Sequence, residues 1–319
     1  MPAVLFVKTS SLGDVIHHMP AITDARRRLP DAHFAWVVEE AYAPLVALHP
    51  AVNAVIPVAS RRWRRDVLRR SVWHEVSNFL RSLRTRNYDH IVDTQGLIRS
   101  ALIAKLARGR RHGYDAASIR EPIAARFYDV CHTVPRNLHA IARNRTLTAL
   151  ALGYQSEGPP NFGLQRERFL AGSSSSPYAV LLHATARREK EWSEPNWMAL
   201  AKSLEQQGLS TILPWGTAEE RGRSERLAVR LPAAKVPERL PLDSVVRLLA
   251  GASVVIGVDT GLLHLAAALA VPLVAIFVGS EPGLTGPMGE GPVRVVGGKG
   301  TLPSAEEVIA AAAEVFGRP

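Results

Sequence analysis

The chain has 319 residues, 47% hydrophobic and 21% charged, which is ordinary for a soluble globular protein and excludes intrinsic disorder. Its single cysteine, Cys131, excludes an intramolecular disulfide and a cysteine-based zinc cluster. Residues 1–150 hold 23 lysines and arginines against 12 acidic residues, whereas residues 151–319 hold 16 against 17, so the net charge of +10 lies in the first half. A basic half predicts an anionic partner, unless arginine is simply abundant for solubility or through genomic bias.

The first half alternates short apolar runs with helical patterns. Strands are expected at 3–7, 34–38, 52–58 and 90–93, and helices at 14–28, 71–86, 96–107 and 137–152. Pro20 is expected to kink the first helix or to break it early. Strands that alternate with helices are typical of crossover connections and predict a parallel sheet.

Clusters of Gly, Ser and Pro then interrupt the pattern, and they predict a linker at 161–176 between domains 1–160 and 177–319. The second half repeats the alternation. Its strands are expected at 178–182, 211–213, 253–258 and 273–277, and its helices at 195–207, 217–230, 242–250, 261–270 and 304–316. The predicted fold class is therefore α/β, with two doubly wound, Rossmann-like parallel-sheet domains that face a cleft and bind ligands at the carboxyl ends of their strands.

We expect no secretion signal and no membrane-spanning segment. Residues 1–7 lack a basic stretch before the apolar run, and the longest apolar stretch contains His264 and Pro272. A cytoplasmic location is therefore expected.

The strongest local feature is the segment 258–264, where a buried strand ends and a helix begins. Helix starts leave backbone N–H groups without an internal partner and favour an anion. Gly261 would let a phosphate approach the backbone, Thr260 adds a hydroxyl, and Asp259 could cap the helix or orient His264. The segment fits a diphosphate site, and it fits a capped core helix with a buried histidine equally well.

A similar junction follows the first strand, in Lys8-Thr-Ser-Ser-Leu-Gly-Asp14. Gly13 permits a tight turn or a close approach. Asp14 stands at a helix start, where a carboxylate either caps the helix or serves as a base toward a bound hydroxyl.

Two more junctions lie in the second half. Thr185 and Lys190 follow the strand 178–182, and Lys190 could neutralise the charge that builds on a departing phosphate, although a solvated charged loop would look the same. Glu219 and Glu220 follow the next strand and are candidates for binding a ribose hydroxyl or for ordinary first-turn acids.

The run from Arg61 to Arg65, with Arg69 and Arg70 beyond it, suits carboxylates and phosphates. Trp63 inside the run makes single-stranded nucleic acid conceivable, but no nucleic-acid-binding motif accompanies it. We therefore favour an anionic small or lipid acceptor over nucleic acid, beside the alternative of a solvated charged face. Neither Asp-x-Asp, GxGxxG nor HExxH occurs, so no essential metal and no cofactor are expected.

Together these motifs resemble the heptosyltransferase I family of lipopolysaccharide core synthesis, from about residue 3 to 285. The resemblance is carried by 8–14, 36–40, 56–58 with 61–64, Asp93 with 95–97, 120–122, 183–185 with Lys190 and Trp192, 214–216 and 259–264. The opening loop and the Arg-Arg-Trp-Arg run look more like type I than type II. This resemblance implies an inverting GT-B glycosyltransferase that moves heptose from ADP-L-glycero-β-D-manno-heptose to the inner Kdo of Kdo2-lipid A at the cytoplasmic face of the inner membrane.

The resemblance also implies roles for individual residues. Asp14 would be the base, Lys190 would stabilise the leaving ADP, and the anionic membrane surface would be a peripheral partner of the basic half. The implied donor-binding residues are Gly13, Thr185, Glu220, Asp259, Thr260, Gly261 and His264. The acceptor-binding residues that we predict are Ser10, Arg61, Arg62, Arg65 and Arg120. The family often has a second threonine where this chain has Ala186, so one hydroxyl toward the diphosphate is missing.

Other functions are also compatible with the sequence. Heptosyltransferase II and a sugar-nucleotide epimerase share the architecture, and a non-catalytic nucleic-acid-binding protein would use the basic half alone. We expect a monomer that binds no nucleic acid.

Overall fold

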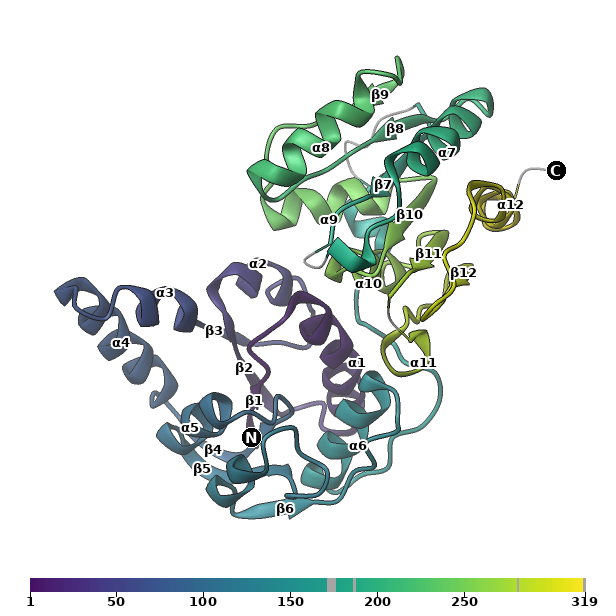
Figure 1. Ribbon diagram of the computed structural model, residues 1–319. Coiled ribbons are helices and arrows are strands. Elements are labelled where there is room, and N and C mark those ends of the chain that lie inside the picture. The colour runs from purple at the N-terminus through teal and green to yellow at the C-terminus, as the bar shows by residue number, and fades with distance from the viewer. Residues whose placement is uncertain (171–175, 186–187, 280, 318–319) are drawn as a thin grey trace. The chain divides into compact units, whose positions relative to one another are not determined.

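The computed structural model describes residues 1–170, 176–185, 188–279 and 281–317 (Figure 1). The chain forms two compact units, Met1–Gly163 and Leu164–Pro319, each built around a sheet of its own. We call them the first and the second unit. The predicted linker, 161–176, spans the boundary between them, and its residues 171–175 lie outside the described part of the chain.

The sheet of the first unit has six parallel strands in the order β3-β2-β1-β4-β5-β6. The strands are β1 (Ala3–Val7), β2 (His33–Glu39), β3 (Ala54–Val58), β4 (Asn87–Asp93), β5 (Arg108–Tyr114) and β6 (Val130–His132). The chain starts at the centre with β1, runs outward to β3, and returns to the other side of β1 with β4. The strand order therefore reverses between β1 and β4, which is where such sheets bind ligands.

The second unit repeats this arrangement in the order β12-β11-β10-β7-β8-β9, again with parallel pairing. Its strands are β7 (Tyr178–Leu182), β8 (Ser210–Ile212), β9 (Ala234–Lys235), β10 (Val254–Val258), β11 (Leu273–Phe277) and β12 (Val293–Gly297). The order reverses between β7 and β10. The α/β class and the two parallel sheets are thus confirmed, whereas the cleft between the domains stays a prediction.

Helices cover both faces of the first sheet. On one face α4 and α5 close over Leu5, Val37 and Ile91, which are fully buried. On the other, α1 packs against α6, and His18 contacts the rings of Phe6 and Trp36. The helices of this unit are α1 (Leu12–Arg28), η1 (Glu40–Tyr42), α2 (Ala43–Val46), α3 (Ser60–Arg65), α4 (Arg70–Leu83), α5 (Ile98–Leu106), η2 (Pro122–Phe127) and α6 (Ala140–Leu152).

The expected early break at Pro20 does not occur, and α1 continues to Arg28. Proline removes one intrahelical hydrogen bond. Burial of the helix from Val15 to Ile22 offsets this loss, because packing contributes more to helix stability than local propensity does.

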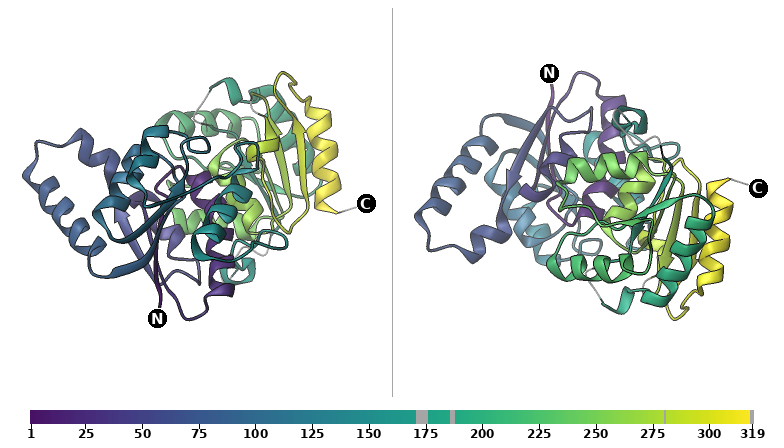
Figure 2. Two further views of the ribbon diagram at one scale, coloured as in Figure 1. Left: turned by 90° about the horizontal axis from the view of Figure 1, so that it is seen from below. Right: turned by 90° about the horizontal axis from the view of Figure 1, so that it is seen from above.

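In the second unit, α7 and α12 cover one face of the sheet around the buried rings of Trp192 and Trp197. Figure 2 shows α12 along the outer side of this unit's strands. The predicted cap of α12 is confirmed: Ser304 Oγ accepts the Glu307 N–H, and Glu307 Oε2 accepts the Ser304 N–H. The helices are η3 (Arg166–Phe169), η4 (Arg188–Lys190), α7 (Glu194–Gln206), α8 (Ala218–Ala228), α9 (Leu242–Gly251), α10 (Gly261–Ala268), α11 (Pro282–Thr285) and α12 (Ala305–Phe316).

A buried ion pair joins α1 to α6 in the first unit. Arg145 Nε lies 2.6 Å from Asp24 Oδ2, and the same guanidinium donates to the carbonyl oxygens of Gly158 and Glu157. We predict that Asp24→Ala lowers the free energy of unfolding by about 3–5 kcal/mol, because it leaves a buried cation without its carboxylate. Denaturant titration measures this. The exposed pair of Arg28 and Glu157 provides the control, since Glu157→Ala should cost less than about 1 kcal/mol, and equal losses would contradict the prediction.

Three histidines form a row across β4, β5 and β6. His90 Nδ1 lies 3.1 Å from His112 Nε2, and His112 Nδ1 lies 3.1 Å from His132 Nε2. Burial, and to a lesser extent the neighbouring imidazoles of His90 and His132, lower the pKa of His112 to about 4. Burial also lowers the pKa of His90 and of His132. The folded row therefore stays neutral at pH values where unfolded histidines take up protons.

This row predicts a stability that falls as the pH drops below about 6.5, the ordinary histidine pKa. The unfolded state binds protons there and the folded state does not, so protonation favours unfolding. Between pH 7.5 and 5, His112 contributes a loss on the order of 1–2 kcal/mol. Denaturant midpoints at both pH values check this, and His112→Gln should reduce the difference. An unchanged pH dependence in that variant would show that the row does not carry the effect.

Candidate functional site

The loops after β7 and β10 meet at the point where the strand order of the second unit reverses. Leu182, the last residue of β7, pairs with Gly257 near the end of β10. A side chain at Gly257 would bring its Cβ within 2.7 Å of the Leu182 Cβ, so this glycine permits the close approach of the two strands. The Thr185 hydroxyl donates to the Asp259 carbonyl oxygen over 3.1 Å and ties the loops together.

The Asp259 carboxylate lies between two cationic or potentially cationic groups. Its Oδ2 pairs with Lys190 Nζ from η4, and its Oδ1 lies 3.9 Å from His264 Nε2 on α10. The Lys190 and Asp259 side chains are 18% and 13% exposed, so the pair is shielded from water but still reachable. The structure thus brings together Thr185, Lys190, Asp259 and His264, as the sequence predicts.

The start of α10 completes this edge of the sheet. Thr260 is the N-cap in an extended conformation, and the helix begins at Gly261. The first backbone N–H groups of a helix favour an anion, and the Lys190 ammonium group, paired with Asp259, lies nearby. The arrangement suits a diphosphate, which carries two neighbouring negative groups.

A cavity of about 870 Å³ adjoins this edge within the second unit. Thr185 lines one part of it, and Glu220 at the start of α8 lines another. Glu220 Oε2 accepts the N–H groups of Gly216 and Thr217, at 2.6 and 3.1 Å, so the carboxylate caps α8 while it faces the cavity. Small-molecule sites commonly have volumes of about 300–1,000 Å³, and this one has room for a nucleotide.

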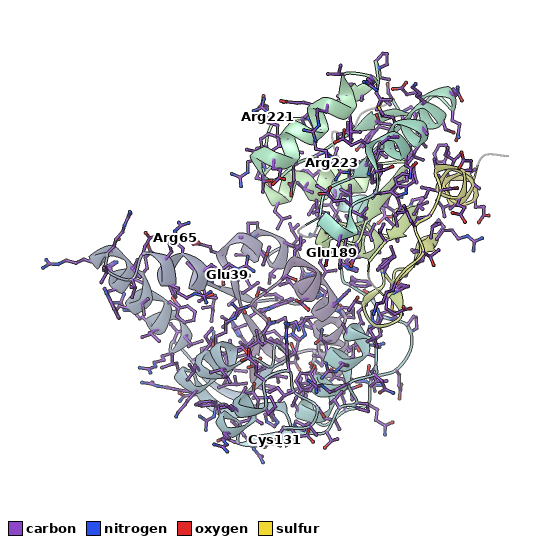
Figure 3. The ribbon with its side chains drawn as sticks, in the orientation of Figure 1. Glu39, Arg65, Cys131, Glu189, Arg221 and Arg223 are labelled. Atoms are coloured by element: carbon purple, nitrogen blue, oxygen red, sulfur yellow. The ribbon has the colours of Figure 1, made fainter. Side chains whose placement is uncertain are left out.

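Sequence reasoning missed Arg223, which lines the same cavity from α8 (Figure 3). Its guanidinium is buried, donates to the carbonyl oxygens of His183 and Trp192, and pairs with Glu191 at 2.8 Å. Beneath it, burial lowers the pKa of His183 to about 4, and the ring shares a 2.8 Å hydrogen bond with Ser224. Arg223 thus fixes the loop after β7.

The first unit has a corresponding edge between β1 and β4. Lys8 follows β1, and its Nζ donates to the Thr94 carbonyl oxygen after β4. Burial lowers the pKa of Lys8. Gln95 Oε1 accepts the N–H groups of Thr9 and Ser10, so the loop after β4 holds the loop after β1.

Asp93, at the end of β4, is fully buried and anchors this loop. It accepts the Tyr128 hydroxyl at 2.8 Å and the N–H groups of Gln95 and Gly96. Burial raises the pKa of Asp93. Burial lowers the pKa of Lys8 for the same reason, because a low-dielectric environment disfavours both the protonated lysine and the ionised aspartate.

Asp14 stands at the start of α1, one residue after Gly13, and is partly exposed. Its Oδ2 accepts the Ser11 N–H at 2.8 Å and the Ser11 hydroxyl at 3.0 Å. The helix-cap role is therefore present in the structure, and the role as a base stays a prediction. Ser10 is buried, and its hydroxyl accepts a hydrogen bond from Arg99 at 2.6 Å. Sequence reasoning missed Arg99.

The predicted acceptor arginines differ in their surroundings. Arg61, Arg65 and Arg120 are exposed, and Figure 3 marks Arg65 on α3. Arg62 instead bridges two carboxylates, those of Glu40 and Glu75, at 2.9 and 2.8 Å. Arg62 therefore has internal partners, and these raise its pKa. To bind the acceptor as predicted, Arg62 would have to replace one of these two carboxylates with an anionic group of the acceptor.

Two further observations concern only the described residues. No group of three or more His, Cys, Asp or Glu side chains among them could hold a metal ion. Within the same part of the chain, every helix is too short or too polar to cross a membrane. Ala186, where the family often has a threonine, lies outside the described residues.

Two parallel sheets with this strand order have the architecture of the GT-B glycosyltransferases, and the cavity in the second unit has room for a nucleotide. The sequence model of glycosyltransferase family 9 (heptosyltransferase) matches residues 76–311. Lipopolysaccharide heptosyltransferase 1 of Pseudomonas aeruginosa is 45% identical over 297 residues, which are 92% of this chain and 83% of that protein. The chain belongs to glycosyltransferase family 9, the heptosyltransferases.

Solved structures agree. Escherichia coli heptosyltransferase WaaC with ADP has a TM-score of 0.91 and 40% identity, covering 98% of this chain and 99% of that one. The same enzyme with ADP-2-deoxy-2-fluoro heptose has a TM-score of 0.85 and 39% identity, covering 98% of each chain. The resemblance to heptosyltransferase I that the sequence motifs carry is confirmed.

Proposed function

We propose that this enzyme transfers L-glycero-D-manno-heptose from ADP-heptose to the inner Kdo of Kdo2-lipid A, with inversion at the anomeric carbon. The observation that carries the proposal is the second unit's cavity, where Thr185 of the β7 loop and Glu220 of α8 face one space beside the Lys190–Asp259 pair. The similar WaaC structures, which hold ADP and an ADP-heptose analogue, support this use of the cavity.

The donor residues divide by the part of ADP-heptose that they would contact. Lys190, Thr185 and the start of α10, Thr260 and Gly261, would bind the diphosphate. Glu220 would bind a ribose hydroxyl through a carboxylate already oriented by its own backbone contacts. Asp259 holds Lys190 in place and, with His264, borders the sugar; Gly13 would let the donor approach the backbone of the first unit.

The reaction is a single in-line displacement. The acceptor hydroxyl oxygen forms a bond to the anomeric carbon while the bond from that carbon to the β-phosphate oxygen breaks. The hydroxyl proton passes to the Asp14 carboxylate, which acts as a general base. Lys190 and the N–H groups of α10 stabilise the negative charge that ADP gains as it leaves.

The acceptor is polyanionic, which accounts for the positive charge of the first half. Arg61, Arg65 and Arg120 are exposed and could pair with Kdo carboxylates or lipid A phosphates. Arg62 would bind the acceptor after giving up its pair with Glu40 or Glu75. Ser10 would bind it through its hydroxyl only after release from Arg99 and exposure, because this side chain is buried. We further propose a monomer that works at the cytoplasmic face of the inner membrane as a peripheral protein.

ADP release by the purified protein tests the proposal. With ADP-heptose, release should require Kdo2-lipid A and should persist in EDTA, because Lys190 supplies the positive charge that a metal would otherwise provide. Release without acceptor, or no release from demonstrably folded protein, would contradict the assignment. Conversion of ADP-heptose into an epimer, without any acceptor, would favour an epimerase.

A further inference from the structure

The turn between α3 and α4, together with the start of α4, carries exposed apolar side chains that the proposed reaction does not use. Val67 is 47% exposed, Leu68 95% and Trp73 61%. We call these three residues the apolar tip. In Figures 1 and 2, α3 and α4 extend away from the sheet of the first unit, and the turn that joins them is their far end. Exposed apolar side chains at the projecting end of a helical hairpin are typical of an interaction surface.

Positive charge surrounds the apolar tip. Between residues 60 and 73 the chain has six arginines and one aspartate, which leaves an excess of five positive charges. Arg64, Arg69 and Arg70 are exposed, and none of the three belongs to the predicted acceptor site. Asp66 pairs with Arg65 and Arg69 only at 3.6 and 3.4 Å. Pairs as exposed as these neutralise little of the local field.

The hairpin that carries the apolar tip is braced. Trp63 Nε1 on α3 donates to Glu75 Oε2 on α4 at 2.7 Å, and the Trp63 ring packs on the edge of Phe79 with centroids 5.6 Å apart. Arg62 pairs with the same Glu75. These contacts hold α3 and α4 together, so the apolar tip is presented by a supported pair of helices.

We propose that the α3–α4 hairpin docks this enzyme on a lipid bilayer with anionic headgroups. Leu68, Val67 and Trp73 enter the interfacial layer, and the arginines around them contact lipid phosphates. Surface-binding segments combine apolar side chains with Lys and Arg in this way, and tryptophan is enriched at the membrane interface. A single-stranded nucleic acid would need aromatic stacking platforms, and the most exposed residue here is aliphatic.

The docking rests on the proposed function in one respect, since a lipid acceptor gives the enzyme a reason to bind a bilayer. Arg61 lies on α3, the helix that leads to the apolar tip. Insertion of the tip would therefore hold Arg61, Arg62 and Arg65 of α3 at the depth of the headgroups, where Kdo and the lipid A phosphates are found.

Vesicle flotation tests the docking without any acceptor. The protein should bind vesicles of phosphatidylcholine mixed with phosphatidylglycerol, bind neutral phosphatidylcholine far less, and dissociate as salt rises. The double variant Leu68→Ser with Trp73→Ser should lose at least about tenfold in partitioning, because two apolar side chains no longer enter the interface. Val229→Ser, which changes an 85% exposed valine of the second unit, should bind like the wild type.

Fluorescence gives a second readout. Brominated phosphatidylcholine in the anionic vesicles should quench part of the wild-type tryptophan emission. Trp73→Phe should retain binding and lose most of that quenching, since Trp36, Trp192 and Trp197 are fully buried or nearly so. Trp63 is partly buried and held against Glu75 and Phe79, and Trp215 is partly buried in the second unit. Unchanged quenching in this variant would show that the apolar tip does not enter the bilayer.

The proposal is wrong if the wild type does not bind anionic vesicles, or if the double variant binds them as tightly. A single-stranded oligonucleotide that binds both proteins equally and displaces the vesicles would assign the arginines to nucleic acid. ADP release with a deacylated, water-soluble acceptor separates this proposal from the proposed function. Wild type and double variant should be equally active there, and inactivity of both would contradict the transfer reaction and leave the vesicle result intact.

Discussion

Asp14→Asn should slow heptose transfer by about 10²–10⁴-fold while ADP-heptose binds nearly as tightly as before. The amide keeps the shape of the side chain and can still accept the Ser11 N–H, but it cannot take the proton of the attacking hydroxyl. Turnover and donor affinity are measured separately, by acceptor-dependent ADP release and by calorimetric titration with ADP-heptose.

The control must separate a base from a helix cap, because Asp14 has the second role in the structure. Glu307 occupies the equivalent position in α12, where it accepts the Ser304 N–H at 2.7 Å. Glu307→Gln should therefore reproduce any effect of a weakened cap on stability and leave turnover unchanged. If Asp14→Asn also has near-normal turnover, Asp14 is a cap and the base lies elsewhere.

Lys190→Met should lower turnover by about 10²–10³-fold and weaken the binding of ADP as well. The methionine keeps much of the side chain's volume and removes the charge that would offset the leaving diphosphate. The Asp259 carboxylate, only 13% exposed, would then lose its pairing with Lys190 and repel the donor. Single-turnover ADP release and ADP titration measure the two effects.

Lys235→Met provides the matched control, because Lys235 is an exposed lysine at the end of β9 that does not line the cavity. It should leave turnover and ADP binding unchanged. Melting temperatures of both variants show whether loss of the Asp259 pair has unfolded the second unit. A folded Lys190→Met protein with turnover within a few-fold of the wild type would remove Lys190 from the reaction.

The central strands could be predicted from the sequence because burial on both faces makes them continuous apolar runs. β1, β7 and β11 begin and end where the sequence predicts. β5 was missed, since its sequence Arg-Gly-Arg-Arg-His-Gly-Tyr has no apolar run and its first three residues are exposed. Its pairing with β4 and β6, not a local pattern, holds it in the sheet. The half-exposed edge strand β12 escaped prediction for a similar reason.

Some residues of the candidate site could likewise be predicted from the sequence, and others could not. Polar residues that follow apolar strands could be located, because the carboxyl ends of parallel strands share one edge of a sheet. Arg99 and Arg223 could not, since each occurs in a helical pattern where an arginine normally faces water. Arg99 meets Ser10 across 89 positions of the sequence, and Arg223 meets His183 across 40. Such distant partners leave no mark on the local sequence.

The contiguity of each unit in the sequence has a consequence for synthesis on the ribosome. Every strand of the first sheet lies before Gly163, so this sheet takes no strand from the 156 residues between Leu164 and Pro319. At about 5–20 residues per second, those residues take roughly 8–30 s to translate. We expect protease-resistant nascent chains once the first unit has emerged. Its parallel sheet, in which β1 must wait for β4, would then assemble before competing β-strands from the second unit exist.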